Sequence, residues 1–182
     1  MVTLSPSQLS LELRRGQNPD LARRRWIIGL SFVTAVAGQV VTLYQTGIIS
    51  HLPDPPLDIF DSDKVDASDY AYKRLQMPDA PAMIITAGIT AALASAGGKD
   101  RATQQPWLPV ALLGKTLIDL VTNVQLGREE WQENKKFCFY CQTSTVAATV
   151  AAVLAVPEAV RAIKTLLGKQ PAQTSTTSPD SK

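Results

Sequence analysis

The sequence predicts an all-α protein, an integral membrane four-helix bundle with a long extracytoplasmic loop between its first two helices. Three observations predict this fold class. Charges are nearly absent from four stretches of the 182 residues and crowded between them, as in small polytopic membrane proteins. The fourth stretch runs for 20 residues without a charge, about the length that crosses a bilayer core. The only two cysteines open that stretch as Cys138-Phe139-Tyr140-Cys141.

The four expected membrane helices cover residues 26–44, 81–98, 107–126 and 137–156. The second is rich in small residues, which allow close helix contacts in lipid. The third contains Lys115 and Asp119, which are four residues apart and can neutralise each other on one helix face. Ionisable side chains within a membrane helix usually face the interior and mark function. The pair is therefore either part of a polar pocket or a packing pair, and a soluble amphipathic helix remains an alternative for this segment.

The distribution of basic residues predicts the orientation. Arginines and lysines precede the first segment, lie between the second and third, and follow the fourth, whereas the loop 45–80 contains seven aspartates. The positive-inside rule then places both termini in the cytoplasm and puts the loop and the turn 127–136 outside. The CxxC pair is expected near the outer face, where disulfides can persist. Both a bacterial inner membrane and a thylakoid membrane fit this pattern.

Three regions are expected along the chain. Residues 1–23 form a cytoplasmic N-terminal segment, residues 24–160 the transmembrane domain, and residues 161–182 a cytoplasmic polar tail. The end of that tail, from residue 170, is rich in Ser, Thr and Pro and is expected to be disordered. A short surface helix is expected over residues 63–75 of the loop. The net charge of +2, without a basic block, predicts no binding to nucleic acid.

The two cysteines favour a redox-active dithiol. Thiols at CxxC spacing can close a small disulfide, and a helix that starts at the pair would stabilise a thiolate through its dipole. A static disulfide, inert thiols or a metal site are the alternatives. A zinc site would need further ligands, and the single His51 lies in another segment, so no metal is expected. Phe139 and Tyr140 are placed either to border a flat ring substrate or to pack at the membrane interface.

The order of these segments resembles the vitamin K epoxide reductase family: one helix, a long outward loop, two helices, and a CxxC that opens the fourth helix. Residues 65–71 and 77–81 are similar to the loop pattern of that family, and Phe137 precedes the CxxC as in its active-site motif. The resemblance covers residues 24–160. It implies a membrane thiol–quinone oxidoreductase with a quinone as co-substrate, in which Cys141 attacks the quinone or its epoxide and Cys138 resolves the adduct as a disulfide.

The resemblance also implies a quinone-binding site. Ser68 lies where the family often has a Ser or Thr that guards the pocket. The other candidates are Phe139, Tyr140, Lys115 and Asp119. Family members receive electrons through a second cysteine pair in the loop, reduced by a thioredoxin-like partner. This loop has no cysteine: Ser62 occupies the nearer position, and the other falls near Asp54. Either an external thiol protein therefore reacts with the CxxC directly, or this chain has lost the full cycle.

The expected activity is thiol–quinone oxidoreduction, with disulfide formation outside the cytoplasm as its physiological use. The expected partners are membrane lipid, a quinone and a thioredoxin-like thiol protein. The alternative function is a non-catalytic membrane subunit, or a quinone- or pigment-binding scaffold, with the same fold. The acidic, cysteine-free loop favours that alternative, whereas the CxxC itself favours the enzyme.

Overall fold

The computed structural model describes residues 5–73 and 76–168, and helices dominate these residues. The described part contains no β-strand, only an isolated parallel bridge between Phe60 and Phe137. The all-α class is therefore confirmed, while the expected disordered tail lies outside the described residues. The helices are α1 (Pro6–Arg15), α2 (Pro19–Gln45), α3 (Ser62–Asp66), α4 (Asp69–Tyr72), α5 (Ala80–Ser95), α6 (Arg101–Gln104), α7 (Trp107–Asn134) and α8 (Phe139–Leu166).

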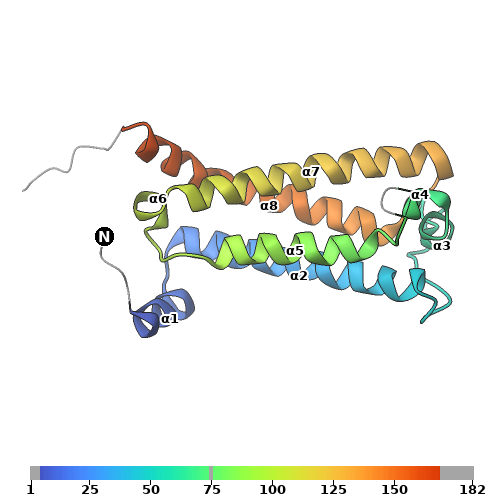
Figure 1. Ribbon diagram of the computed structural model, residues 1–182, viewed down its shortest axis with the longest axis horizontal. Helices are drawn as coiled ribbons and strands as arrows, with labels where there is room; N and C mark the ends of the chain where they lie inside the picture. Colours follow the sequence, from blue (N-terminus) through green and yellow to red (C-terminus); the bar gives the residue numbers. More distant parts are fainter. Residues whose placement is uncertain (1–4, 74–75, 169–182) are drawn as a thin grey trace, which may run out of the picture.

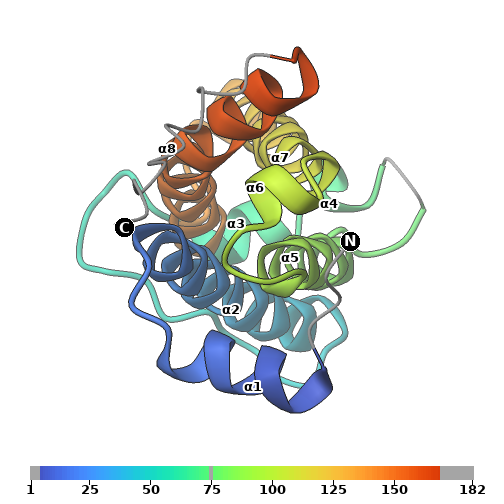
Figure 2. The same cartoon turned by 90° about the vertical axis from the view of Figure 1, so that its left-hand side faces the viewer.

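The four longest helices, α2, α5, α7 and α8, run side by side (Figure 1). Helix α2 packs against α5 and α8, and α7 packs against the same two helices, so the four close into a ring. Helices α3 and α4 lie at one end of this array, whereas α1, α6 and the end of α8 lie at the other. Figure 2, which looks from the second end, shows α1 lying crosswise to the long helices.

Three of these helices, α2, α7 and α8, are long and apolar enough to cross a membrane. Helix α5 is apolar but has only 16 residues. Large apolar side chains point outward from the array, and several are more than half exposed. Such a surface suits lipid rather than water, because extensive apolar exposure is unusual on a soluble monomer. These side chains include Phe32, Val36, Ile85, Ile118, Val121 and Val153.

The expectation of a turn over residues 127–136 is wrong. Helix α7 continues through this stretch as far as Asn134, because the sequence there is rich in helix-forming Glu and Gln. It ends where Lys135 takes a left-handed conformation, with φ of 56°. Helix α8 extends beyond the expected membrane segment 137–156 to Leu166, with Pro157 inside it.

The expected single helix over residues 63–75 is also replaced, by the two short helices α3 and α4. The break falls at Ala67 and Ser68, where Ser68 has an extended backbone and precedes α4. The Ser68 hydroxyl donates to the Val65 carbonyl at 2.6 Å, and this bond competes with continued helix formation. Helix α3 is held by its own cap, since the Asp61 carboxylate accepts from the Lys64 amide.

A buried arginine cluster organises the end of the array that is remote from α3 and α4. Arg101 is fully buried and makes two hydrogen bonds of 2.9 Å to Glu158 of α8. It also donates to carbonyls near the end of α5, including that of Leu93. Arg24 of α2 donates to the carbonyls of Gly97 and Gly98 just beyond α5. Helix ends leave carbonyls without intrahelical partners, and these guanidinium groups satisfy them.

Candidate functional site

The CxxC pair lies at the start of α8. Cys138 is the N-cap residue, and its Sγ accepts a hydrogen bond from the Cys141 amide at 3.2 Å. Cys138 is completely buried, whereas Cys141 is partly exposed, and both are free thiols. The expectation that the pair meets a helix N-terminus is therefore confirmed. The cap geometry directs the two sulfurs to one side of the first turn.

Two buried carboxylates flank this pair. A carboxylate oxygen of Asp66, from α3, and the Sγ atoms of Cys138 and Cys141 all lie within 4.8 Å of one another. Glu130, from α7, accepts hydrogen bonds from the Cys138 amide at 3.3 Å and from the Gln142 side chain at 3.1 Å. Both acids are about 98–99% buried. Each also has a second oxygen, Asp66 Oδ2 and Glu130 Oε1, without a hydrogen-bond partner.

Burial is the largest influence on the pKa values of Asp66 and Cys138, whereas the contact with Cys138 is the largest influence on that of Cys141. It raises the pKa of Asp66 from 3.8 to about 7, and the hydrogen bond with the Cys138 thiol offsets only part of this effect. Burial likewise raises the pKa of Cys138, although its contact with Cys141 acts in the other direction. The expected thiolate stabilised by the helix dipole is therefore wrong for Cys138. Desolvation of the charged form outweighs the dipole at a fully buried position.

The segment between α2 and α5 is attached to the CxxC by backbone and side-chain hydrogen bonds. The Asp61 amide donates to the Phe137 carbonyl at 3.0 Å, and the Phe137 amide donates to the Ile59 carbonyl at 2.9 Å. Ser62 Oγ accepts from the Phe139 amide at 2.9 Å and donates to Asp54 at 2.6 Å. Ser62 and Asp54, at or near the positions where the resemblance places the family's loop cysteines, are thus hydrogen-bonded to each other. They hold the loop against the first turn of α8.

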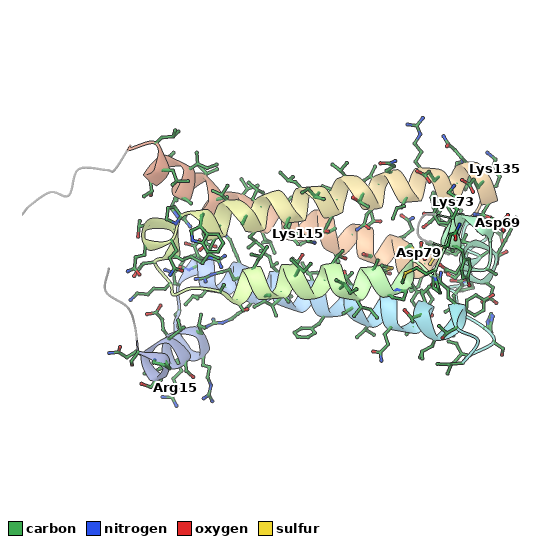
Figure 3. All side chains as sticks on the ribbon, in the orientation of Figure 1. Arg15, Asp69, Lys73, Asp79, Lys115 and Lys135 are labelled. Carbon is green, nitrogen blue, oxygen red and sulfur yellow. The ribbon has the colours of Figure 1, made fainter. Side chains whose placement is uncertain are left out.

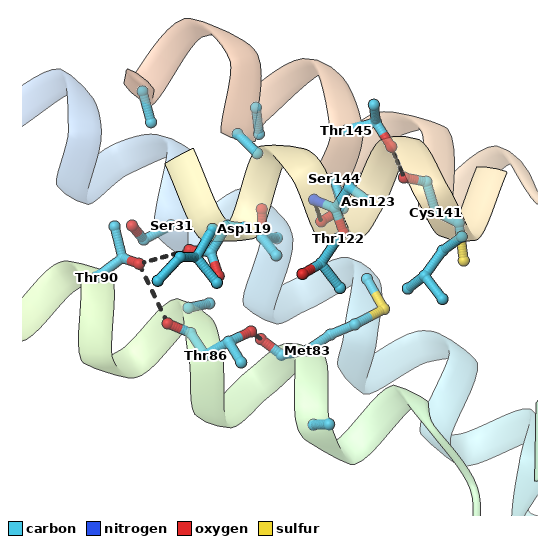
Figure 4. Close-up of a pocket in the computed structure, with 18 of the residues that line it drawn as sticks. Ser31, Met83, Thr86, Thr90, Asp119, Thr122, Asn123, Cys141, Ser144 and Thr145 are labelled. Atoms are coloured by element: carbon cyan, nitrogen blue, oxygen red, sulfur yellow. Dashed lines mark hydrogen bonds between the residues drawn. The ribbon is translucent and has the colours of Figure 1, made fainter. Parts of the chain in front are cut away.

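A cavity of about 470 Å³ opens between α2, α5, α7 and α8, next to the dithiol. Cys141 forms part of its wall, as Figure 4 shows, whereas Cys138 does not. Asn123 and Ser144 lie along the wall near Cys141. The surface of the cavity is mainly apolar with a few polar groups, the usual make-up of a site for an apolar ring compound.

A polar cluster forms part of the cavity wall at its other end. Lys115 and Asp119 form the expected ion pair at 2.5 Å, with both side chains partly buried. The Lys115 ammonium also donates to Thr90 Oγ1 at 3.2 Å, and Thr90 Oγ1 lies 3.1 Å from Asp119. Figure 3 shows Lys115 midway along the array, far from the charged residues Asp69 and Lys135 at the loop end. The positive charge of Lys115 in the middle of the array is therefore neutralised by Asp119.

The residues predicted for the quinone site fall into two groups. Lys115 and Asp119 line the cavity together with Cys141, whereas Ser68, Phe139 and Tyr140 are not among the lining residues. The Phe139 ring packs edge-to-face on Phe60, with ring centroids 5.6 Å apart. The Tyr140 hydroxyl donates to the Pro53 carbonyl at 3.0 Å. These two aromatic residues therefore contact the loop.

The roles of Asp66 and Glu130 could not be predicted from the sequence. Asp66 is one of seven aspartates in an acidic loop, and Glu130 follows another glutamate in a segment predicted to be an exposed turn. Only the tertiary packing buries them. Next to Glu130, the Trp131 ring stacks on Phe137, with ring centroids 5.2 Å apart, and no local sequence pattern marks this contact.

The fold and the site together define a class: helical membrane proteins that carry a buried dithiol beside an internal cavity. The profile of the vitamin K epoxide reductase family matches residues 25–156, which is most of the chain. The protein belongs to that family, whose members are membrane thiol–quinone oxidoreductases. It is an integral membrane protein. No curated protein sequence matches the chain.

Proposed function

We propose that this protein is a four-span membrane enzyme that transfers electrons between the Cys138/Cys141 dithiol and a membrane quinone. The observation that carries the proposal is the position of Cys141 in the wall of an apolar cavity among α2, α5, α7 and α8. A quinone ring entering from the lipid would reach the Cys141 sulfur there. The co-substrate is a quinone, in line with the family.

Helix α5 is the fourth span in this proposal. Its 16 residues correspond to about 24 Å, somewhat less than the ~30 Å hydrocarbon core of a typical bilayer. Local thinning of the bilayer can accommodate such a mismatch. Its neighbours α2 and α7 are long enough to cross by themselves. The transmembrane domain then covers residues 24–160, between a segment of residues 1–23 and a tail of residues 161–182.

The chemistry consists of two steps. The Cys141 sulfur attacks a ring carbon of the quinone and forms a covalent C–S bond. The Cys138 sulfur then attacks Cys141 Sγ, the C–S bond breaks, and the electron pair stays with the ring. Two thiols become one disulfide, and two electrons and two protons convert the quinone to the hydroquinone. Asp66 is the proposed proton acceptor for Cys138, since a carboxyl group with a pKa of about 7 exchanges protons well near neutral pH.

The cavity offers hydrogen-bond donors that would orient the ring. The Asn123 side chain lies near Cys141, and Lys115 lies further along with Asp119 as its counter-ion. A quinone carbonyl needs a donor, and a donor that meets the developing negative charge lowers the barrier. Ser68 and Tyr140 would act indirectly, by holding the loop against the dithiol.

The electron donor or acceptor on the thiol side must come from another protein, because the chain has no further cysteine. A thioredoxin-like thiol protein at the outer face has the required chemistry. Cys138 is fully buried beneath the loop, so the loop must move away before a partner thiol can reach it. Exchange with such a partner would support disulfide formation outside the cytoplasm.

A single-turnover experiment tests the proposal without knowledge of that partner. The full chain in lipid nanodiscs is reduced, freed of reductant and mixed with a short-chain quinone. We expect one hydroquinone per chain and the loss of both alkylatable thiols. Cys141→Ser should lower the rate of hydroquinone formation at least ~10³-fold, as removal of a nucleophile does in other enzymes. Cys138→Ser should instead accumulate a quinone adduct that intact-mass measurement detects.

The matched control is Thr149→Ala, a change at an exposed position two turns further along α8, which should behave as the unmodified chain. Hydroquinone formation that survives Cys141→Ser would refute the proposed nucleophile. A thiol state that does not respond to quinone would instead support the non-catalytic scaffold.

A further inference from the structure

The dithiol and the neighbouring Asp66 carboxylate form a set of potential metal ligands, a property that the proposed quinone chemistry does not use. Three potential ligand atoms, two sulfurs and one carboxylate oxygen, lie within 4.8 Å of one another at Cys138, Cys141 and Asp66. The three residues come from two separate segments, α3 and the start of α8. Thiolates two residues apart in a CxxC are half of a typical zinc site, which needs further ligands from elsewhere in the chain. Asp66 supplies one such ligand.

One oxygen of the Asp66 carboxylate has no hydrogen-bond partner. Asp66 is 2% exposed, and its Oδ2 atom has no hydrogen-bond partner. A buried carboxylate oxygen without a partner is unfavourable, because it has lost its hydration without replacement. A cation bound between this oxygen and the two sulfurs would supply the missing interaction. Glu130 Oε1 is likewise buried and without a hydrogen-bond partner, but Glu130 is not in the group of ligand atoms that lie within 4.8 Å of one another.

We propose that the reduced protein binds one thiophilic divalent cation of the zinc class through Cys138 Sγ, Cys141 Sγ and the Asp66 carboxylate. The fourth position of a tetrahedron is left for water from the cavity that Cys141 lines. Binding replaces two thiol protons by two sulfur–metal bonds and leaves the oxidation states unchanged. Zn²⁺ accepts both thiolate and carboxylate ligands, and the two thiolates select it over Mg²⁺ or Ca²⁺.

The site exists only in the reduced state. Closing the Cys138–Cys141 disulfide removes both thiolates, and one carboxylate alone does not hold the ion. Conversely, a bound ion occupies the Cys141 sulfur and protects it from alkylation and from quinone. Metal binding itself does not depend on the proposed quinone activity, so the two can be tested separately.

The test uses the full chain in detergent, reduced with a phosphine that is then removed, and titrated with Co²⁺ as a spectroscopic substitute for Zn²⁺. We expect one Co²⁺ per chain, a thiolate-to-cobalt charge-transfer band, and displacement of the cobalt by Zn²⁺. Asp66→Asn should weaken binding at least ~10- to 100-fold, the loss that even an outer-shell change causes at metal sites. The matched control is Asp69→Asn, an exposed acid in the same loop, which should bind as the unmodified chain does.

A second measurement needs no variant and keeps the proposal falsifiable if Asp66→Asn does not fold. Zn²⁺ should protect both thiols of the unmodified reduced chain from alkylation, and the oxidised chain should give no charge-transfer band. Equal binding by Asp66→Asn and Asp69→Asn would overturn the assignment of Asp66 as a ligand. Absence of the band in the reduced chain, or an equal band in the oxidised chain, would overturn the site altogether.

Discussion

The Asp66 carboxylate is buried beside the sulfurs of Cys138 and Cys141, and only 2% of the residue is exposed. An aspartate in such surroundings is unfavourable as a charged group, and its pKa of about 7 expresses that penalty. A carboxyl group whose pKa is raised by burial beside a nucleophile is typical of functional sites.

The sign of the effect on stability follows from the raised pKa. In the unfolded chain Asp66 ionises near 3.8, and in the folded chain near 7. Stability therefore falls as pH rises from about 4 to about 7 and stays reduced above that range, by up to ~4 kcal/mol. Asp66→Asn removes the charge and should make the reduced protein more stable than the unmodified chain at pH 8.

The measurement is the thermal or denaturant unfolding midpoint of both proteins in the same detergent at several pH values. The gain in stability from Asp66→Asn should vanish near pH ~4, where Asp66 is protonated in both the folded and the unfolded state. Asp69→Asn, at an exposed position of the same loop, should show no such pH-dependent gain. A gain that does not change with pH would contradict the prediction.

At the scale of helices, the contact between α2 and α5 depends on the absence of one side chain. A Cβ atom placed on Gly38 would lie 2.9 Å from Met83 Cβ and 3.2 Å from the Ala80 carbonyl oxygen. The two helices can approach this closely only because glycine is present. This is the small-residue packing that membrane helices use in place of a hydrophobic driving force.

Gly38→Val should separate α2 from α5 and lower the unfolding midpoint, with a loss of about 1–3 kcal/mol typical of overpacking. The same change at Gly29, also in α2, meets no atom within 4 Å and serves as the control. The measurement is thermal unfolding of the two variants in detergent. Equal unfolding midpoints for Gly38→Val and Gly29→Val would show that the close contact between α2 and α5 does not contribute to stability.

The long helices were predictable because each contains a long apolar run, and that pattern is local. The ends of these helices were harder to predict. The charged sequence after Gly127 was taken for a turn, although α7 continues to Asn134 and buries Glu130 within this stretch. The buried pair of Arg101 with Glu158 could not be predicted. Nothing local distinguishes these two from other charged residues, and only the meeting of α6 with α8 pairs them. Of the site, the sequence predicted the dithiol but not the acids around it.

At the scale of the whole molecule, the two ends of the helix array differ in charge and in shape. The end that carries α1 and α6 contains the arginines at positions 14, 15, 23, 24, 25, 101 and 161, while the opposite end contains the aspartate-rich loop. Helix α1 lies crosswise with basic residues in its last turn and Leu11 exposed. A short amphipathic helix of this kind suits the cytoplasmic lipid surface. This arrangement supports the proposed orientation.

Site-specific labelling tests the orientation. In a chain carrying Cys138→Ala and Cys141→Ala, a single cysteine is introduced by Asp58→Cys in the loop or by Ser10→Cys in α1, both exposed positions. In intact spheroplasts, a membrane-impermeant maleimide should label the first variant, and it should label the second only after permeabilisation. Carbonate extraction serves as the control for insertion. The opposite labelling pattern would invert the proposed topology.

The hydrogen bonds between the loop and α8 can form only after the ribosome has made α8. Ser62 and its partner Phe139 are 77 residues apart, and a ribosome that adds about 5–20 residues per second needs about 4–15 s to make that stretch. During this interval the loop has been translated but its docking site does not exist. In the proposed topology the loop is exported before the last helix is made, so it must wait, undocked, for that helix. We expect a protease at the outer face to cleave the loop during that interval but not in the finished protein.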